Sequence, residues 1–199
     1  MRASAPAPGT DVVAGARTLL GVAAAHVVAI AGALALFERW HGRPAFADAP
    51  AQPGGWPGAI AAFVAMAAVR ELLHAAVWQR TSGLSWRAFT VRRSRRKLGV
   101  IVEPTAALCA RDDRRGLVAP SLAFGVAPLV AGLVAGRGLA LLWGAALAFE
   151  GWSDIAIAAA TWRLPAGTPV LPIGSRLGRR VADAPAKRDW ILPQSTLRQ

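Results

Sequence analysis

Tyrosine is absent from this chain of 199 residues, cysteine occurs once, and charged side chains make up only 17% of the sequence. A single cysteine, Cys109, excludes a disulfide within the chain and a zinc site built from cysteines. With 54% hydrophobic residues and a mean hydropathy of +0.38, the chain is too apolar for an ordinary soluble domain of this length. The composition is instead typical of a membrane protein.

Four segments are long and apolar enough to cross a lipid bilayer, which takes about 20 residues of helix. Tryptophans lie near most of their ends, as expected where a helix passes the membrane interface. We therefore predict an all-α integral membrane protein with a membrane domain over residues 14–162. The predicted transmembrane helices cover about 19–37, 56–78, 117–136 and 138–162.

The remaining segments differ in composition from the predicted helices. Residues 1–13 are rich in alanine and proline, and we expect them to be disordered. Residues 163–199 contain five prolines, so we expect an irregular cytoplasmic tail. Two short β-branched runs, 89–91 and 99–102, flank a basic cluster. They predict a small cytoplasmic β-hairpin insert over about 85–108, between the second and third helices.

The net charge of +12 is distributed unevenly among the predicted loops. Ten of the 23 Lys and Arg residues lie between Arg80 and Arg115, and seven lie between Arg163 and Arg198. The loop between the first two predicted helices holds two basic residues, Arg39 and Arg43, and the loop between the last two holds one, Arg137. This alternation follows the positive-inside rule, so we expect a multi-pass cell-membrane protein with both termini in the cytoplasm. Membrane topology therefore accounts for the net positive charge, and we do not expect the protein to bind nucleic acid.

The basic cluster of the insert has a partner of its own in this interpretation. It consists of Arg92, Arg93, Arg95, Arg96 and Lys97. Basic segments next to a membrane are attracted to the anionic lipids of the cytoplasmic leaflet. We therefore expect this cluster to face the lipid and to bind anionic headgroups.

The first apolar segment is also compatible with a cleaved secretory signal, because residues 44–47 end in a small-x-small pattern. The apolar run is nevertheless long for a signal core, and residues 38–41 separate it from that pattern. We therefore expect a retained helix.

Five ionisable side chains lie inside two of the predicted helices. Because a helix turns about 100° per residue, Arg70, Glu71 and His74 share one face of the second helix. Glu150 and Asp154, four residues apart, share a face of the fourth. An ionisable residue within a bilayer costs roughly 2.5–3.5 kcal/mol and usually marks function. We therefore expect the two faces to meet, with Arg70 paired to Asp154 or Glu150.

Residues 70–74 have the spacing of a His-Glu-x-x-His zinc motif, with Arg70 in place of the first histidine. In an intact motif two imidazoles bind zinc and the glutamate activates a water molecule. A guanidinium cannot ligate a cation. At about 4 Å from zinc it would cost on the order of 8 kcal/mol at an effective dielectric of 20. The motif therefore indicates a metalloprotease scaffold and argues against the metal.

Together with the basic insert, residues 151–155 (Gly-Trp-Ser-Asp-Ile) and 164–168 (Leu-Pro-Ala-Gly-Thr), this motif resembles a family of zincin-type membrane peptidases. They are small bacterial and archaeal proteins related to the site-2 proteases, and the resemblance covers about residues 58–178. It implies zinc as cofactor, with His74 and Asp154 at ligand positions and Glu71 at the general-base position. Arg70 falls on the remaining ligand position, and Glu150 is the candidate substitute ligand.

Three functions are compatible with these patterns. We expect a catalytically degenerate site-2-protease-like protein that holds membrane-protein segments as a transmembrane client, with zinc absent or weakly bound. The first alternative is an active zinc-dependent intramembrane metallopeptidase, and the second is a membrane scaffold or transporter-like subunit with structural ion pairs. Metal content separates the first alternative from the others, and capture of a client helix separates our expectation from the second.

Overall fold

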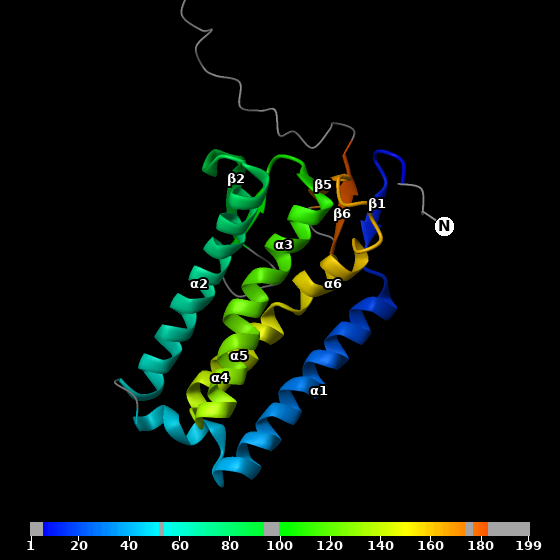
Figure 1. Ribbon diagram of the computed structural model, residues 1–199. Helices are drawn as coiled ribbons and strands as arrows, with labels where there is room; N and C mark the ends of the chain where they lie inside the picture. The colour runs from blue at the N-terminus through cyan, green and yellow to red at the C-terminus, as the bar shows by residue number, and fades with distance from the viewer. Residues whose placement is uncertain (1–5, 52–53, 94–99, 174–176, 183–199) are drawn as a thin grey trace, which may run out of the picture.

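The computed structural model describes residues 6–51, 54–93, 100–173 and 177–182. Most of these residues lie in helices that follow the apolar segments of the sequence (Figure 1). In chain order the helices are α1 (Ala16–His41), the 3-10 helix η1 (Ala45–Ala51), α2 (Gly55–Ser82), the 3-10 helix η2 (Trp86–Ala88), α3 (Ala110–Pro120), the π-helix η3 (Ser121–Val126), α4 (Ala127–Ala135), α5 (Gly138–Glu150) and α6 (Trp152–Ala160).

Three helices of the described chain are long and apolar enough to cross a membrane: α1, α2 and the continuous helix Ala110–Ala135, which joins α3, η3 and α4. The pair α5 and α6 forms a fourth candidate if both helices belong to one span. These lengths and compositions agree with the predicted membrane protein. Helices α1 and α2 each end at a glycine, Gly42 and Gly83, whose φ angles of 65° and 73° suit a left-handed cap.

The third helix begins earlier than predicted, at Ala110 rather than near residue 117. Its first turns are charged, so hydropathy alone assigns them to the preceding loop. Two of these charges favour the helix, because Asp112 and Asp113 lie in its first turn, where backbone N–H groups attract negative charge.

The fourth predicted segment, 138–162, is bent rather than straight. Helices α5 and α6 meet at Gly151 with an angle of 42° between them. Glycine is required there by close packing, since an added Cβ would lie 2.5 Å from Ser121 Oγ. The prediction that Glu150 and Asp154 share one helical face assumed a straight helix, whereas the bend places Glu150 at the end of α5 and Asp154 in the first turn of α6.

The predicted β-hairpin is confirmed. Strand β2 (Phe89–Arg93) pairs antiparallel with β3 (Val100–Pro104), with Val91 opposite Val102. Across the pair, Arg92 Nη2 lies 2.5 Å from Glu103 Oε2. The basic residues Arg95, Arg96 and Lys97, and the side chain of Arg93, lie outside the described part of the chain. Their predicted contact with lipid stays a prediction.

A second sheet, of four strands, was not predicted. Its order is β1-β6-β5-β4, made of β1 (Asp11–Val13), β6 (Gly178–Val181), β5 (Pro169–Pro172) and β4 (Leu108–Cys109). The predictions of a disordered N-terminus and an irregular tail are therefore wrong for the residues in β1, β5 and β6. Composition was misleading because prolines occupy the ends of β5, and because the strands gain stability only by pairing across the chain. Residues 1–5 and 183–199 lie outside the described chain.

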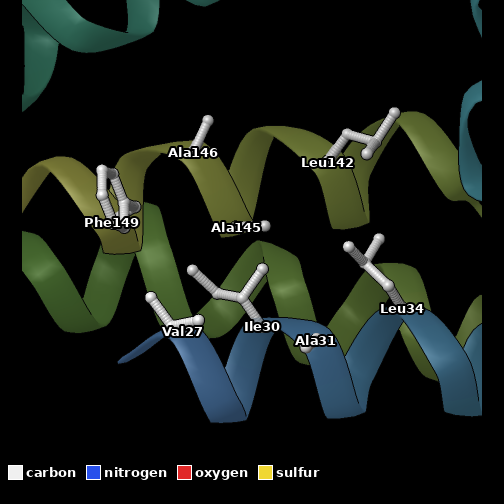
Figure 2. Close-up of a pocket in the computed structure, with 8 residues that line it drawn as sticks. All are labelled: Val27, Ile30, Ala31, Leu34, Leu142, Ala145, Ala146 and Phe149. Atoms are coloured by element: carbon white, nitrogen blue, oxygen red, sulfur yellow. The ribbon is translucent and has the colours of Figure 1, made fainter. Parts of the chain in front are cut away.

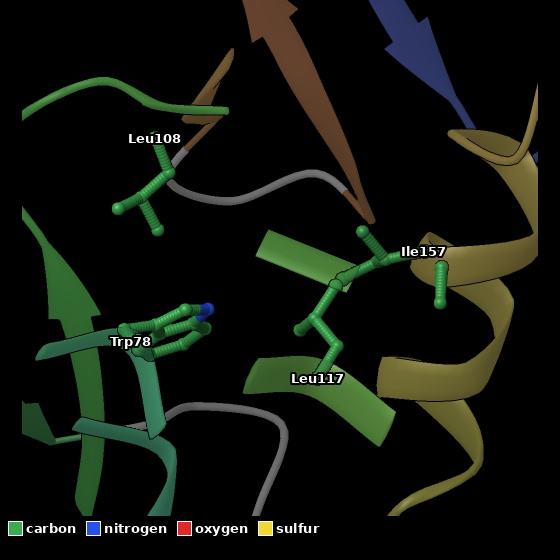
Figure 3. Packing of buried hydrophobic residues seen from close by; sticks show 5 residues of the cluster. Trp78, Leu108, Leu117 and Ile157 are labelled. Atoms are coloured by element: carbon green, nitrogen blue, oxygen red, sulfur yellow. The ribbon is translucent and has the colours of Figure 1, made fainter. Parts of the chain in front are cut away.

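Both sheets lie at the same end of the helices, beside the start of α1 and the end of α2 (Figure 1). At this end an apolar cluster joins α2, α3, α6 and β4 through Trp78, Leu117, Ile157 and Leu108 (Figure 3). Elsewhere, α1 and α5 leave an apolar groove between them, with side chains of both helices along it (Figure 2). The groove is lined by Val27, Ile30, Ala31, Leu34, Leu142, Ala145, Ala146 and Phe149.

Candidate functional site

Four of the predicted site residues form one buried cluster between α2 and α6. Arg70, Glu71 and His74 come from α2, and Asp154 comes from the first turn of α6. Their exposed fractions are 0%, 7%, 2% and 6%. The helical spacing of residues 70, 71 and 74 places all three on one face, as the sequence predicted. Arg70 and His74 approach Asp154 of α6, and Glu71 contacts Arg70.

Arg70 bridges two carboxylates. Its Nη1 donates to Glu71 Oε1 at 2.9 Å, and its Nη2 donates to Asp154 Oδ2 at 2.6 Å. Nη2 also lies 3.3 Å from Ser121 Oγ. The planar guanidinium offers donors in fixed directions, so one side chain satisfies acceptors on two helices. Charge-assisted hydrogen bonds of this kind are about twice as strong as neutral ones.

The orientation of His74 follows from its contact with α3. Its Nδ1 lies 2.7 Å from the carbonyl oxygen of Gly116, and because a carbonyl only accepts, Nδ1 carries the hydrogen. The other ring nitrogen, Nε2, therefore faces the cluster, 3.6 Å from Asp154 Oδ2 and 4.0 Å from Glu71 Oε1. Glycine at 116 is required by Trp78, whose indole ring lies where a Cβ would be.

Glu71 connects the cluster to the hairpin. Its Oε2 accepts a hydrogen bond from the backbone N–H of Val102 in β3, at 3.4 Å. Since Glu71 lies eleven residues before the end of α2 at Ser82, this contact is roughly 16 Å along the helix from that end. Strand β3 therefore runs back beside α2 as far as the buried cluster.

Glu150 is not joined to this cluster by any hydrogen bond or ion pair among the described residues. It is half-buried at the end of α5, before the bend at Gly151. Ser121, Gly151 and the backbone groups of Gly116 and Val102 also belong to the site and were not predicted. For Ser121 and Gly151 a signal was available, because small residues within apolar segments mark close helix contacts in membranes.

A second buried ion pair was also missed. Arg179 of β6 donates to both oxygens of Asp113, at 2.8 and 3.1 Å, and the two residues are 5% and 1% exposed. The carbonyl oxygen of Asp113 accepts from Trp78 Nε1 at 3.2 Å. This pair fastens the four-stranded sheet to α3. No local pattern links two residues that are 66 positions apart in the chain.

The donor set of the cluster does not fit zinc. A catalytic zinc needs three protein ligands and one open position. Here one position holds a guanidinium, which has no lone pair to give, and both carboxylates already accept from it. Within the described residues, no group of three or more His, Cys, Asp or Glu side chains is arranged to hold a metal ion.

Comparisons of the chain with protein-family models, with curated proteins and with solved structures gave no match. The resemblance to zincin-type membrane peptidases therefore depends on the residues of the motif and of the two later segments alone.

Proposed function

We propose that this chain is a multi-pass membrane protein of the site-2-protease type that holds membrane-protein segments without cutting them. The observation that carries the proposal is the guanidinium of Arg70, bonded to Glu71 and Asp154 at once. In the proposed family these two residues are the general base and a metal ligand. The guanidinium supplies positive charge between them, but it offers no open coordination position at which a water could be activated.

In this proposal both termini and the hairpin face the cytoplasm. The support is the excess of Lys and Arg in the stretches 80–115 and 163–198 of the sequence. The exposed Arg92, 42% accessible, belongs to the basic cluster that we expect to attract anionic headgroups.

The apolar groove between α1 and α5 supports a client of apolar helical character. Its lining carries no charged side chain, and both of its walls belong to candidate membrane-crossing segments. Ala31, Ala145 and Ala146 are small, and small residues let a second helix approach closely in a membrane.

Site-specific photocrosslinking in lipid vesicles tests client binding. A single apolar helix of about 20 residues serves as the probe. A crosslinker at Ala146 in the groove should capture this helix intact, and the substitution Ala31→Leu should reduce capture by filling the groove. The matched control is a crosslinker at Val64, an exposed position on α2. Equal capture at both positions, or cleavage of the helix, would contradict the proposal.

An active zinc peptidase is favoured by one observation: Glu71 Oε1 and Asp154 Oδ2 lie 4.0 and 3.6 Å from His74 Nε2. If Arg70 withdrew, three candidate ligands would surround one space. Stoichiometric zinc in the natural protein, lost on His74→Ala, would establish this alternative. A scaffold held together by ion pairs is instead expected to show neither zinc nor capture.

A further inference from the structure

We infer that Ser121 and Gly151 are positioning residues that form a guanidinium-specific pocket for Arg70. Arg70 is the largest fully buried side chain of the described chain. Its position across Glu71 and Asp154 therefore depends on the elements packed around its tip, and not on solvent. This inference rests on the proposal that the guanidinium, and no metal, occupies the site.

Gly151 provides the space. A Cβ at this position would lie 2.9 Å from Arg70 Nη2 and 2.5 Å from Ser121 Oγ, closer than real Cβ contacts. The backbone of Gly151 is in the ordinary right-handed region, with φ −75° and ψ −6°. Glycine is therefore needed here for the room that it leaves beside the guanidinium, and not for an unusual backbone conformation.

Ser121 provides an acceptor from the third helix. It is the first residue of the π-helix η3 and is only 5% exposed. Its Oγ is 3.3 Å from the same nitrogen, Nη2, that binds Asp154. Three separate elements, η3, the α5–α6 bend and α6, thus surround one end of the guanidinium. A lysine has only one nitrogen at its tip. It could not donate to Glu71 and Asp154 from two coplanar nitrogens, as the guanidinium does.

The consequence is that arginine at position 70 is built into the packing of three helices. If arginine had only replaced a histidine at this site, position 151 would not have to be a glycine to leave room for the guanidinium. Ser121 and Gly151 act through Arg70, so substitutions at either position should lose their effect once the guanidinium is removed.

Double-mutant cycles test this dependence, with reversible unfolding of the full chain measured in mixed micelles. In the Arg70 background, Gly151→Ala should lower the folding equilibrium constant about 5- to 150-fold, the range expected for overpacking a buried site. In the Arg70→Ala background the loss should be at least about tenfold smaller where the first loss is large. Arg70 Nη2 is then gone, and the Ser121 hydroxyl, which no longer accepts from it, can rotate away from the added methyl group. Gly32→Ala, at a helical glycine with open space around it, is the matched control.

Ser121→Ala provides a milder second cycle if Gly151→Ala does not fold. It should lower the folding constant about tenfold with Arg70 present, as expected for a bond to a charged group, and have no effect in the Arg70→Ala background. Arg70→Lys should behave like Arg70→Ala. Equal losses in both backgrounds, in whichever cycle is measured, would overturn the inference while leaving a zinc-free natural chain, and so the proposed function, intact. Stoichiometric zinc would overturn the proposed function whatever the cycles give.

Discussion

At the scale of single residues, the site is defined by one cation between two anions. Sequence spacing was sufficient to bring Arg70, Glu71 and His74 onto one face and to predict that Arg70 pairs with an acidic residue of the fourth segment. It could not choose between Asp154 and Glu150 as the partner, because that choice depends on the bend at Gly151. Nor could it place Ser121, whose hydrogen bond depends on how two distant helices pack.

Removing the cation should expose its structural role. Arg70→Ala leaves two buried carboxylates without their shared donor, and we expect the free energy of unfolding to fall by roughly 3–5 kcal/mol. Asp154→Ala in the same chain should recover part of that loss. The coupling energy between Arg70 and Asp154 is obtained by measuring the unfolding of four proteins: the natural chain, the two single variants and the double variant. Additive losses would mean that the two side chains do not stabilise each other.

Asp48, at the opposite end of the molecule, should make the stability of the fold depend on pH. Burial pushes the pKa of Asp48 up, but hydrogen bonds from Arg43 and from the N–H of Gly138 outweigh it, so the pKa lies below the ordinary 3.8. A carboxyl with a lowered folded-state pKa stabilises the fold above its unfolded pKa, and this contribution disappears as pH falls through the lowered value.

We therefore expect the free energy of unfolding of the natural chain to decline below about pH 4 more steeply than that of Asp48→Asn. Acid titration of both proteins, followed by circular dichroism, measures the difference. Parallel curves would show that the contact between η1 and the start of α5 does not depend on the charge of Asp48.

At the scale of elements, hydropathy and β-branched runs located the helices and the hairpin, since both signals are local. The four-stranded sheet was missed because β1 and β6 lie at opposite ends of the chain and each has only three or four residues. The bend between α5 and α6 was missed for another reason. A single glycine is compatible with a straight helix, and only the Arg70 and Ser121 side chains beside it make the glycine necessary.

The contact between α4 and α5 leads to a prediction about small residues. A Cβ on Gly144 would lie 2.7 Å from Leu129 Cα and 2.8 Å from the carbonyl oxygen of Gly125. Because backbone atoms cannot move aside, Gly144→Ala should destabilise the fold by about 1–3 kcal/mol. Gly21→Ala, in open space on α1, should be neutral or stabilising because alanine favours a helix. Thermal unfolding of both variants measures this, and equal melting temperatures would contradict the packing.

At the scale of the whole molecule, the proposed orientation follows from charge. Cysteine substitutions in a Cys109→Ser background test it with a membrane-impermeant thiol reagent on intact cells. Phe46→Cys, exposed in η1, should react from outside, and Arg87→Cys, exposed in η2, should react only after permeabilisation. The reverse pattern would invert the membrane orientation and remove the argument for contact between the basic hairpin and cytoplasmic lipid.

The central claim, that a guanidinium stands where the proposed family has a metal, is tested most directly by the zinc content of the purified protein. Elemental analysis of the natural chain should find little zinc. Arg70→His, which gives His74 and Asp154 a third ligand and removes the charge repulsion, should bind about one zinc per chain, and Arg70→Gln serves as the control without a ligand. Stoichiometric zinc in the natural chain that depends on His74 and Asp154 would contradict the account. A folded Arg70→His variant that gains no zinc would contradict the resemblance at Asp154.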